Sequence, residues 1–291
     1  MKTVKGLHEK MGTFENANTS FHQAARCKRY TNEVLAFSMV KEEELLRATE
    51  EIQNLTYRQG EYKIFKVFEP KERLIMALPF YDRVVQHMIC NAIQPVFENG
   101  FYYHSYACRS GKGMHAASDT LYQWMYETEV KQGLRMYAFK GDISKYFASI
   151  PHDKLKDENR HYIGDKKALM LMDDIIDHNG ILPDGVGIPV GNLTSQLFAN
   201  VYGNKLDKFC KHVLHIPYFV RYMDDFIILS DDLEQLKEWV KRIEEFLENE
   251  MLLHINPKST ILYAVNGIDF CGYIHYADHN KVRKSSIRKL K

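Results

Sequence analysis

The feature that most constrains this chain is a pair of adjacent aspartates, Asp224 and Asp225, between two short apolar and aromatic runs. Residues 218–221 read Tyr-Phe-Val-Arg and residues 226–229 read Phe-Ile-Ile-Leu, which predicts a β-hairpin with both carboxylates at its turn. Adjacent carboxylates repel each other and gain nothing from apolar strands. A divalent cation removes that cost, and two-metal sites for phosphoryl transfer need such a cluster. For an isolated Asp-Asp pair, an exposed acidic turn is the alternative.

A second acidic strand lies upstream. Residues 136–143 read Met-Tyr-Ala-Phe-Lys-Gly-Asp-Ile, a β-rich run that leads to Asp142. Gly141 permits close approach of backbone or ligand beside that carboxylate. Because about eighty residues separate the two acidic runs, their carboxylates can cooperate only if the two strands pair in one sheet.

With both acidic runs in place, the chain resembles a reverse transcriptase. Asp142 matches the first catalytic motif of that family, and Asp224 and Asp225 match its Tyr-x-Asp-Asp box. Five further segments match family motifs in the family's order, namely two fingers motifs, the template and nucleotide support, the lysine motif and the primer-grip hairpin: residues 73–86, 106–113, 187–196, 253–260 and 267–273. The resemblance covers roughly residues 62–273.

The resemblance implies an α+β, right-hand polymerase fold with fingers and palm, and with a thumb that is minimal or missing. The expected domains are an N-terminal extension with fingers (1–135, to which 153–185 return), a palm with the catalytic motifs (136–266), and a primer-grip hairpin with the start of a thumb or basic tail (267–291). Only eighteen residues follow Tyr273. We therefore expect either a truncated chain or a minimal thumb that a partner completes.

The resemblance also implies an enzyme, an RNA-directed DNA polymerase that transfers nucleotides with Mg²⁺, or with Mn²⁺ in its place. The expected metal ligands are Asp142, Ile143, Asp224 and Asp225, and the expected catalytic residues are the three aspartates and Lys258. Hard cations such as Mg²⁺ prefer these oxygen ligands. Lys258 would neutralise or protonate the pyrophosphate leaving group.

Other matched positions imply contacts to nucleotide, primer and template. The expected nucleotide-binding residues are Arg73, Arg109, Phe147, Gly191 and Gln196, and the expected primer or template contacts are Asn192, Phe270 and Gly272. Phe147 lies five residues after Asp142, where the family places the ring that excludes a 2′-hydroxyl. The alternatives are a buried core aromatic for Phe147 and surface salt bridges for the arginines and Lys258.

The third motif bears on the type of reverse transcriptase. Group II intron and retron enzymes usually carry Pro-Gln-Gly there, whereas this chain has Pro189-Val190-Gly191 followed by Ser195-Gln196. That variant resembles the enzymes of diversity-generating retroelements, which copy a template RNA into cDNA and misincorporate mainly opposite adenine. The implied partners are template RNA, primer and cDNA, dNTPs and a small accessory protein.

Two alternatives stay open. One is a phage-defence or orphan bacterial reverse transcriptase, similar to retron or abortive-infection enzymes. The other is a catalytically idle relic that binds nucleic acid, against which the three intact aspartates argue. The formal net charge of only +1 does not indicate a nucleic-acid partner, but residues 281–291 hold six basic residues and no acidic one.

Composition and periodicity set the remaining expectations. The N-terminus has no apolar signal region and no apolar run reaches the ~18 residues of a membrane span, so we expect a cytoplasmic protein without membrane contact. Helices are predicted over 41–53, 81–97, 115–130 and 231–250. The last has a continuous apolar stripe, Asp231 as N-cap and Glu234 in capping-box position. It should back the catalytic hairpin, with helices on one face of the sheet.

Overall fold

The computed structural model describes residues 3–68 and 72–290, and the chain divides into two compact units. The first unit contains Met1–Gly100 and Phe147–Val201, and the second contains Phe101–Tyr146 and Tyr202–Lys291. Each unit is therefore made from two separate segments of the chain. This division does not test the predicted bounds of fingers, palm and primer-grip region, which stay predictions.

The first unit is mainly helical. Its elements are α1 (Leu7–Met11), α2 (Phe14–Ala24), α3 (Asn32–Met39), α4 (Lys41–Gln53), the hairpin β1 (Lys63–Phe68) and β2 (Glu72–Ala77), α5 (Phe80–Glu98), α8 (His152–Tyr162) and α9 (Lys166–Asp177). Helix α5 is the hub, because α1, α2 and α3 all contact it. The rings of Phe21, Phe37 and Phe80 lie within 6.0 Å of one another at this junction. The predicted helices 41–53 and 81–97 correspond to α4 and α5.

The second unit is built on an antiparallel sheet of four strands. The strands are β3 (Tyr137–Asp142), β4 (Tyr218–Tyr222), β5 (Asp225–Ser230) and β6 (Thr260–Tyr263), in the order β4-β5-β3-β6. Strands β4 and β5 form the predicted hairpin, with Tyr222 opposite Asp225 as its last pair. Strand β3 pairs with β5 along its whole length, so the prediction that the two acidic strands share one sheet is confirmed.

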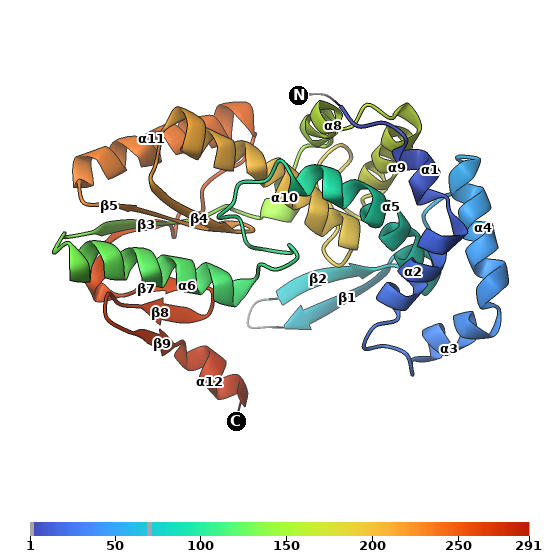
Figure 1. Cartoon of the computed structure of the whole chain (residues 1–291), viewed down its shortest axis with the longest axis horizontal. Coiled ribbons are helices and arrows are strands. Elements are labelled where there is room, and N and C mark those ends of the chain that lie inside the picture. Colours follow the sequence, from blue (N-terminus) through green and yellow to red (C-terminus); the bar gives the residue numbers. More distant parts are fainter. Residues whose placement is uncertain (1–2, 69–71, 291) are drawn as a thin grey trace. The chain divides into compact units, whose positions relative to one another are not determined.

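Helices cover both faces of this sheet, so the prediction of helices on one face is wrong. Figure 1 shows α6 (Met114–Met125) and α11 (Leu233–Glu250) on opposite sides of the strands. Ile227 and Leu229 of β5 pack in one core with Leu121 of α6, and α11 contacts β3 and β5. The reason lies in β5 itself: its apolar residues are continuous rather than alternating, and all are buried. Such a strand needs cover on both faces.

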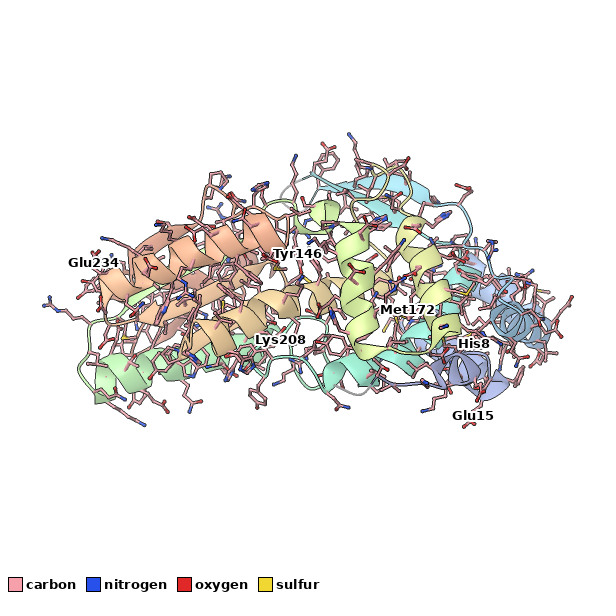
Figure 2. The ribbon with its side chains drawn as sticks, turned by 90° about the horizontal axis from the view of Figure 1, so that it is seen from above. His8, Glu15, Tyr146, Met172, Lys208 and Glu234 are labelled. Atoms are coloured by element: carbon pink, nitrogen blue, oxygen red, sulfur yellow. The ribbon has the colours of Figure 1, made fainter. Side chains whose placement is uncertain are left out.

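Helix α11 confirms the predicted apolar stripe but begins one residue later than its predicted cap implies. Leu236, Ile243 and Leu247 are fully buried, whereas Glu234, labelled in Figure 2 near the start of the helix, is exposed. The N-cap is Asp232, whose side chain accepts hydrogen bonds from the N–H groups of Glu234 and Gln235. The prediction of Asp231 as N-cap is therefore wrong, because Asp232 already satisfies these helix donors.

The outer edge of β4 is paired with a short loop segment. Ser105 and Arg221 form a parallel bridge, in which the Arg221 N–H donates to the His104 carbonyl and the Tyr106 N–H donates to the Arg221 carbonyl, both at 3.0 Å. This segment therefore satisfies backbone groups that an edge strand would otherwise expose.

The remaining elements complete the second unit. They are the π-helical turns Tyr126–Lys131 and Phe209–Val213, the 3₁₀ turn Ala264–Asn266, a small sheet of β7 (Ile268–Phe270), β8 (Tyr273–His275) and β9 (Asn280–Val282), and helix α12 (Lys284–Leu290). Helices α7 (Tyr146–Ser149) and α10 (Leu193–Lys208) run from one unit into the other along the chain. No helix in the described part of the chain is both long and apolar enough to span a membrane.

Candidate active site

Three carboxylates gather at one end of the four-stranded sheet. Asp142, the last residue of β3, is the register partner of Asp225, the first residue of β5. Asp224 lies in the turn between β4 and β5, and its carbonyl accepts a hydrogen bond from the Ile143 N–H at 3.1 Å. Residues from distant parts of the chain are thus held together by a sheet ladder rather than by loops.

The electrostatics of this group favour a bound cation. The pKa of the Asp225 carboxyl is raised to about 6, first by burial and then by the negative charges of Asp224 and Asp142, while Lys140 and Arg283 act in the opposite direction. A raised pKa means that the ionised form is disfavoured in this crowded setting. A divalent cation would relieve the repulsion that the carboxylates impose on one another.

The donor set fits a hard cation that shares its ligands with substrate. Within residues 3–68 and 72–290, no three His, Cys, Asp or Glu side chains already form a metal-holding group. Mg²⁺ does not require one, because it commonly binds one or two carboxylates and completes its shell with water and substrate phosphates. Asp142 and Asp224 are the carboxylates expected to act in this way. Metal binding by Asp142, Asp224, Asp225 and the Ile143 carbonyl stays a prediction.

Asp142 is fixed by two residues that sequence analysis did not single out. The Asn256 side-chain amide donates to Asp142 Oδ2 at 2.6 Å, and the Asn256 backbone N–H donates to the Asp142 carbonyl at 2.7 Å. The Asp142 N–H donates to Ser259 Oγ at 3.0 Å. Both partners lie in the segment Asn-Pro-Lys-Ser, whose turn composition was the available signal.

Lys258 sits on this same turn. Its N–H donates to Asn256 Oδ1 at 3.1 Å, and the Ser259 N–H closes the turn on the Asn256 carbonyl at 2.8 Å. The Lys258 side chain is exposed. The turn that orients Asp142 thus also carries the lysine, and the catalytic role of that lysine stays a prediction.

The predicted primer-grip segment forms a tight hairpin. Cys271 and Gly272 connect β7 to β8 with φ angles of 49° and 84°, as two-residue hairpin turns with positive φ require. Burial and then the charge of Asp225 raise the pKa of the Cys271 thiol to about 12. Phe270 is 1% exposed in the core. Primer contacts by Phe270 and Gly272 stay predictions.

Arg109 is engaged with its own loop. Its Nη1 donates to the carbonyls of Tyr102 and Ser105 at 2.7 and 2.6 Å, and its guanidinium lies 5.3 Å from the ring centre of Phe101. These contacts stabilise the segment that pairs with β4. Nucleotide binding by Arg109 stays a prediction.

The other predicted residues belong to the first unit. Arg73 is exposed on β2, and Asn192 is buried with its Nδ2 donating to Tyr62 Oη at 2.8 Å. Gln196 lines a cavity of about 200 Å³ together with Lys28 and His87, among others. Of these three predicted residues, Arg73 and Gln196 are the ones whose side chains a ligand could reach.

The third motif packs directly on β2. The Met76 N–H donates to the Val190 carbonyl at 3.0 Å. Gly191 has φ of 125°, and a Cβ there would lie 2.8 Å from the Met76 carbonyl oxygen. Gly191 is therefore required by backbone contact. Phe147 is half-buried, and its carbonyl accepts from the Ile188 N–H at 2.8 Å, so Phe147 and the third motif are tied within one unit. Sugar selection by Phe147 stays a prediction.

Comparisons with known proteins agree with this geometry. The family described as reverse transcriptase (RNA-dependent DNA polymerase) matches residues 66–275. Protein YkfC of Escherichia coli K12 is 25% identical over 250 residues, covering 70% of this chain and 62% of that protein. The putative COX1/OXI3 intron 2 protein of Saccharomyces cerevisiae is 22% identical over 254 residues, covering 66% and 29%. The chain thus spans less than two thirds of the length of these relatives.

Solved structures with a similar fold include two telomerases. Telomerase from Candida albicans, in complex with a fragment of telomeric RNA, has a TM-score of 0.54 at 14% identity and covers 78% of this chain and 45% of that one. Apo telomerase from Candida tropicalis has a TM-score of 0.56 at 13% identity and covers 77% and 49%. At such identities the likeness concerns the fold, and it confirms the predicted α+β polymerase fold with fingers and palm.

Proposed function

We propose a function from the premise that this chain belongs to the reverse transcriptase family, which matches residues 66–275. The chain synthesises DNA on an RNA template, with Asp142 and Asp224 as metal-binding carboxylates and Asp225 completing the acidic group. The observation that carries the proposal is the register of β3 and β5, which sets Asp142 opposite Asp225 beside the turn that holds Asp224.

The chain's own residues would act by binding and orientation. The metal, when bound, would stabilise the negative charge on the attacking and leaving oxygens of the phosphoryl transfer. Asn256 holds one oxygen of Asp142, which fixes the direction of the carboxylate before substrate arrives. Lys258, exposed on the same turn, would neutralise the departing pyrophosphate. Phe147 would exclude ribonucleotides, because a hydroxyl cannot enter a volume that the ring fills.

At finer resolution, we propose the error-prone enzyme of a diversity-generating retroelement. Support comes from Val190, an aliphatic residue where related enzymes carry glutamine, held against β2 through its carbonyl. A site without that amide leaves fewer polar groups unpaired by a mismatch, so it discriminates less. Template RNA, primer, dNTPs and a small accessory protein are the partners of this proposal. A phage-defence or orphan bacterial reverse transcriptase is the alternative.

The test is dNTP incorporation on a primed RNA template by wild type and by Asp224→Asn. Losing a charge that holds the metal should lower the rate by roughly 10²–10³-fold. Asp231→Asn is the matched control, since it removes an exposed carboxylate beyond the opposite end of β5 and should keep the wild-type rate. Chelation of divalent cations should abolish synthesis, and added Mg²⁺ should restore it. Equal rates for wild type and Asp224→Asn would refute the proposal.

A further inference from the structure

A fully buried ion pair lies beneath the catalytic turn. Arg221 of β4 and Asp207 of α10 are both 0% exposed. Arg221 Nε donates to Asp207 Oδ1 at 2.6 Å and Nη2 donates to Oδ2 at 2.7 Å, a bidentate pair. Burying two charges is expensive, and apolar residues of similar volume are often as stable. The presence of this ion pair is therefore explained only by a role that apolar side chains could not fill.

The third guanidinium nitrogen, Nη1, indicates what this role is. Arg221 Nη1 donates to the Met223 carbonyl at 2.8 Å. Met223 and Asp224 are the two residues of the turn between β4 and β5, and Met223 has φ of 60°. That left-handed conformation is unfavourable for a side chain of this size. The guanidinium thus holds a strained backbone unit directly before Asp224.

The surroundings are shaped for the guanidinium. A Cβ on Gly203 would lie 2.6 Å from Arg221 Nη1 and 2.8 Å from Tyr146 Oη, so a larger residue at 203 would displace one of them. Tyr146, labelled in Figure 2, is 2% exposed and lies four residues after Asp142. Ser105 Oγ accepts from Nη2 at 3.0 Å. The arginine therefore has one defined position, and that position meets the turn.

The turn between β4 and β5 also positions the end of the neighbouring strand β3. The Asp224 carbonyl accepts from the Ile143 N–H at 3.1 Å, next to Asp142. Hydrogen bonds thus connect Asp207 to Arg221 and Arg221 to Met223. A further hydrogen bond connects Asp224, the next residue of the turn, to Ile143 beside the end of β3. We propose that Arg221, clamped by Asp207, is a positioning residue that fixes the Met223–Asp224 turn and so the direction of the Asp224 carboxylate. The effect of Arg221 on catalysis rests on the proposed function, whereas its effect on the conformation of the turn does not.

The first test needs no activity. The double variant Asp207→Leu/Arg221→Met removes the charges together, which keeps the core apolar and avoids an unpaired buried charge. Hydrogen exchange of the Ile143 N–H should become faster by about tenfold or more, because its acceptor lies in the released turn. Amides in the middle of β3 and β5 should change by less than about threefold. Unchanged exchange at Ile143, or equal acceleration along both strands, would overturn the proposal.

The second test asks whether the turn matters to the site. At saturating dNTP, the double variant should lose about tenfold or more in kcat with little change in KM for dNTP, and it should need more Mg²⁺ for half-maximal rate. Binding of Mn²⁺ without substrate should weaken in parallel. Ser105→Ala is the matched control, since it removes a contact of Nη2 and leaves Nη1 on the Met223 carbonyl. Wild-type kcat and Mn²⁺ affinity in the double variant would overturn the proposal. If wild type makes no DNA, the proposed function fails while the exchange experiment still decides the role of Arg221.

Discussion

At Gly141, a single added methyl group should lower the free energy of unfolding through a direct steric clash. Gly141 is the register partner of Phe226, and a Cβ at 141 would clash with several atoms of that ring. The Phe226 ring is 0% exposed and lies 5.8 Å from Phe139 and 6.0 Å from Phe219 between ring centres. The ring therefore cannot swing aside without disturbing its neighbours. What approaches Gly141 is this ring, rather than the backbone or ligand that the sequence suggests.

The expected cost of Gly141→Ala follows from these contacts. Overpacking a dense core costs about 1–3 kcal/mol, and replacing glycine returns about 0.4–1 kcal/mol by restricting the unfolded chain. The net loss in free energy of unfolding is therefore about 0–2.6 kcal/mol. For a domain of this size, that corresponds to a fall in Tm of at most roughly 10 °C.

The measurement is urea unfolding of four proteins: wild type, Gly141→Ala, Phe226→Leu and the double variant. Leucine leaves room for the new methyl group, so the double variant should be more stable than the sum of the single losses implies. The difference should exceed about 0.5 kcal/mol, beyond what independent sites show. Additive losses would refute the steric argument.

Three further predictions follow from other parts of the structure. Asp232→Ala should destabilise the protein by about 1 kcal/mol in urea unfolding by removing the α11 cap, while Asp231→Ala should be close to neutral; equal losses would contradict the capping geometry. Phe147→Ala should raise the use of rNTPs relative to dNTPs in primer extension, and an unchanged ratio in an active variant would assign Phe147 to packing alone. Sequenced cDNA should show errors concentrated opposite template adenine, and Val190→Gln should reduce them, because ~1.4 kcal/mol of discrimination is about tenfold in error rate. An error spectrum without an adenine excess, with a cognate accessory protein present, would favour the defence alternative.

Local patterns were enough to predict the sheet end that carries the carboxylates. The β4–β5 hairpin follows from two apolar runs around an acidic pair, and α11 follows from its apolar period. Pairing of β3 with β5 followed from chemistry, since Asp142 needed a partner strand. These inferences succeed because each depends on residues close in sequence or on a charge cluster that only one arrangement relieves.

Partners that are distant in sequence were not predictable in the same way. Asn256 reads as a turn residue, and nothing local shows that its amide reaches Asp142. Arg221 stands in a predicted strand, but its partner Asp207 lies on another element and is recognised only once the strand and helix pack. The choice between Asp231 and Asp232 as cap likewise depends on where the backbone turns, which two identical neighbouring residues do not reveal.

The segment beside β4 has a consequence for the handling of this protein. Strands β4 and β5 together hold one of the most apolar stretches of the chain, and low-charge β-rich stretches associate with copies of themselves when a strand edge is open. The bridge between Ser105 and Arg221 closes that edge with only a few residues. Cleavage within residues 101–113 should therefore lead to fibrous or insoluble protein. Shelf life would then depend on that short loop.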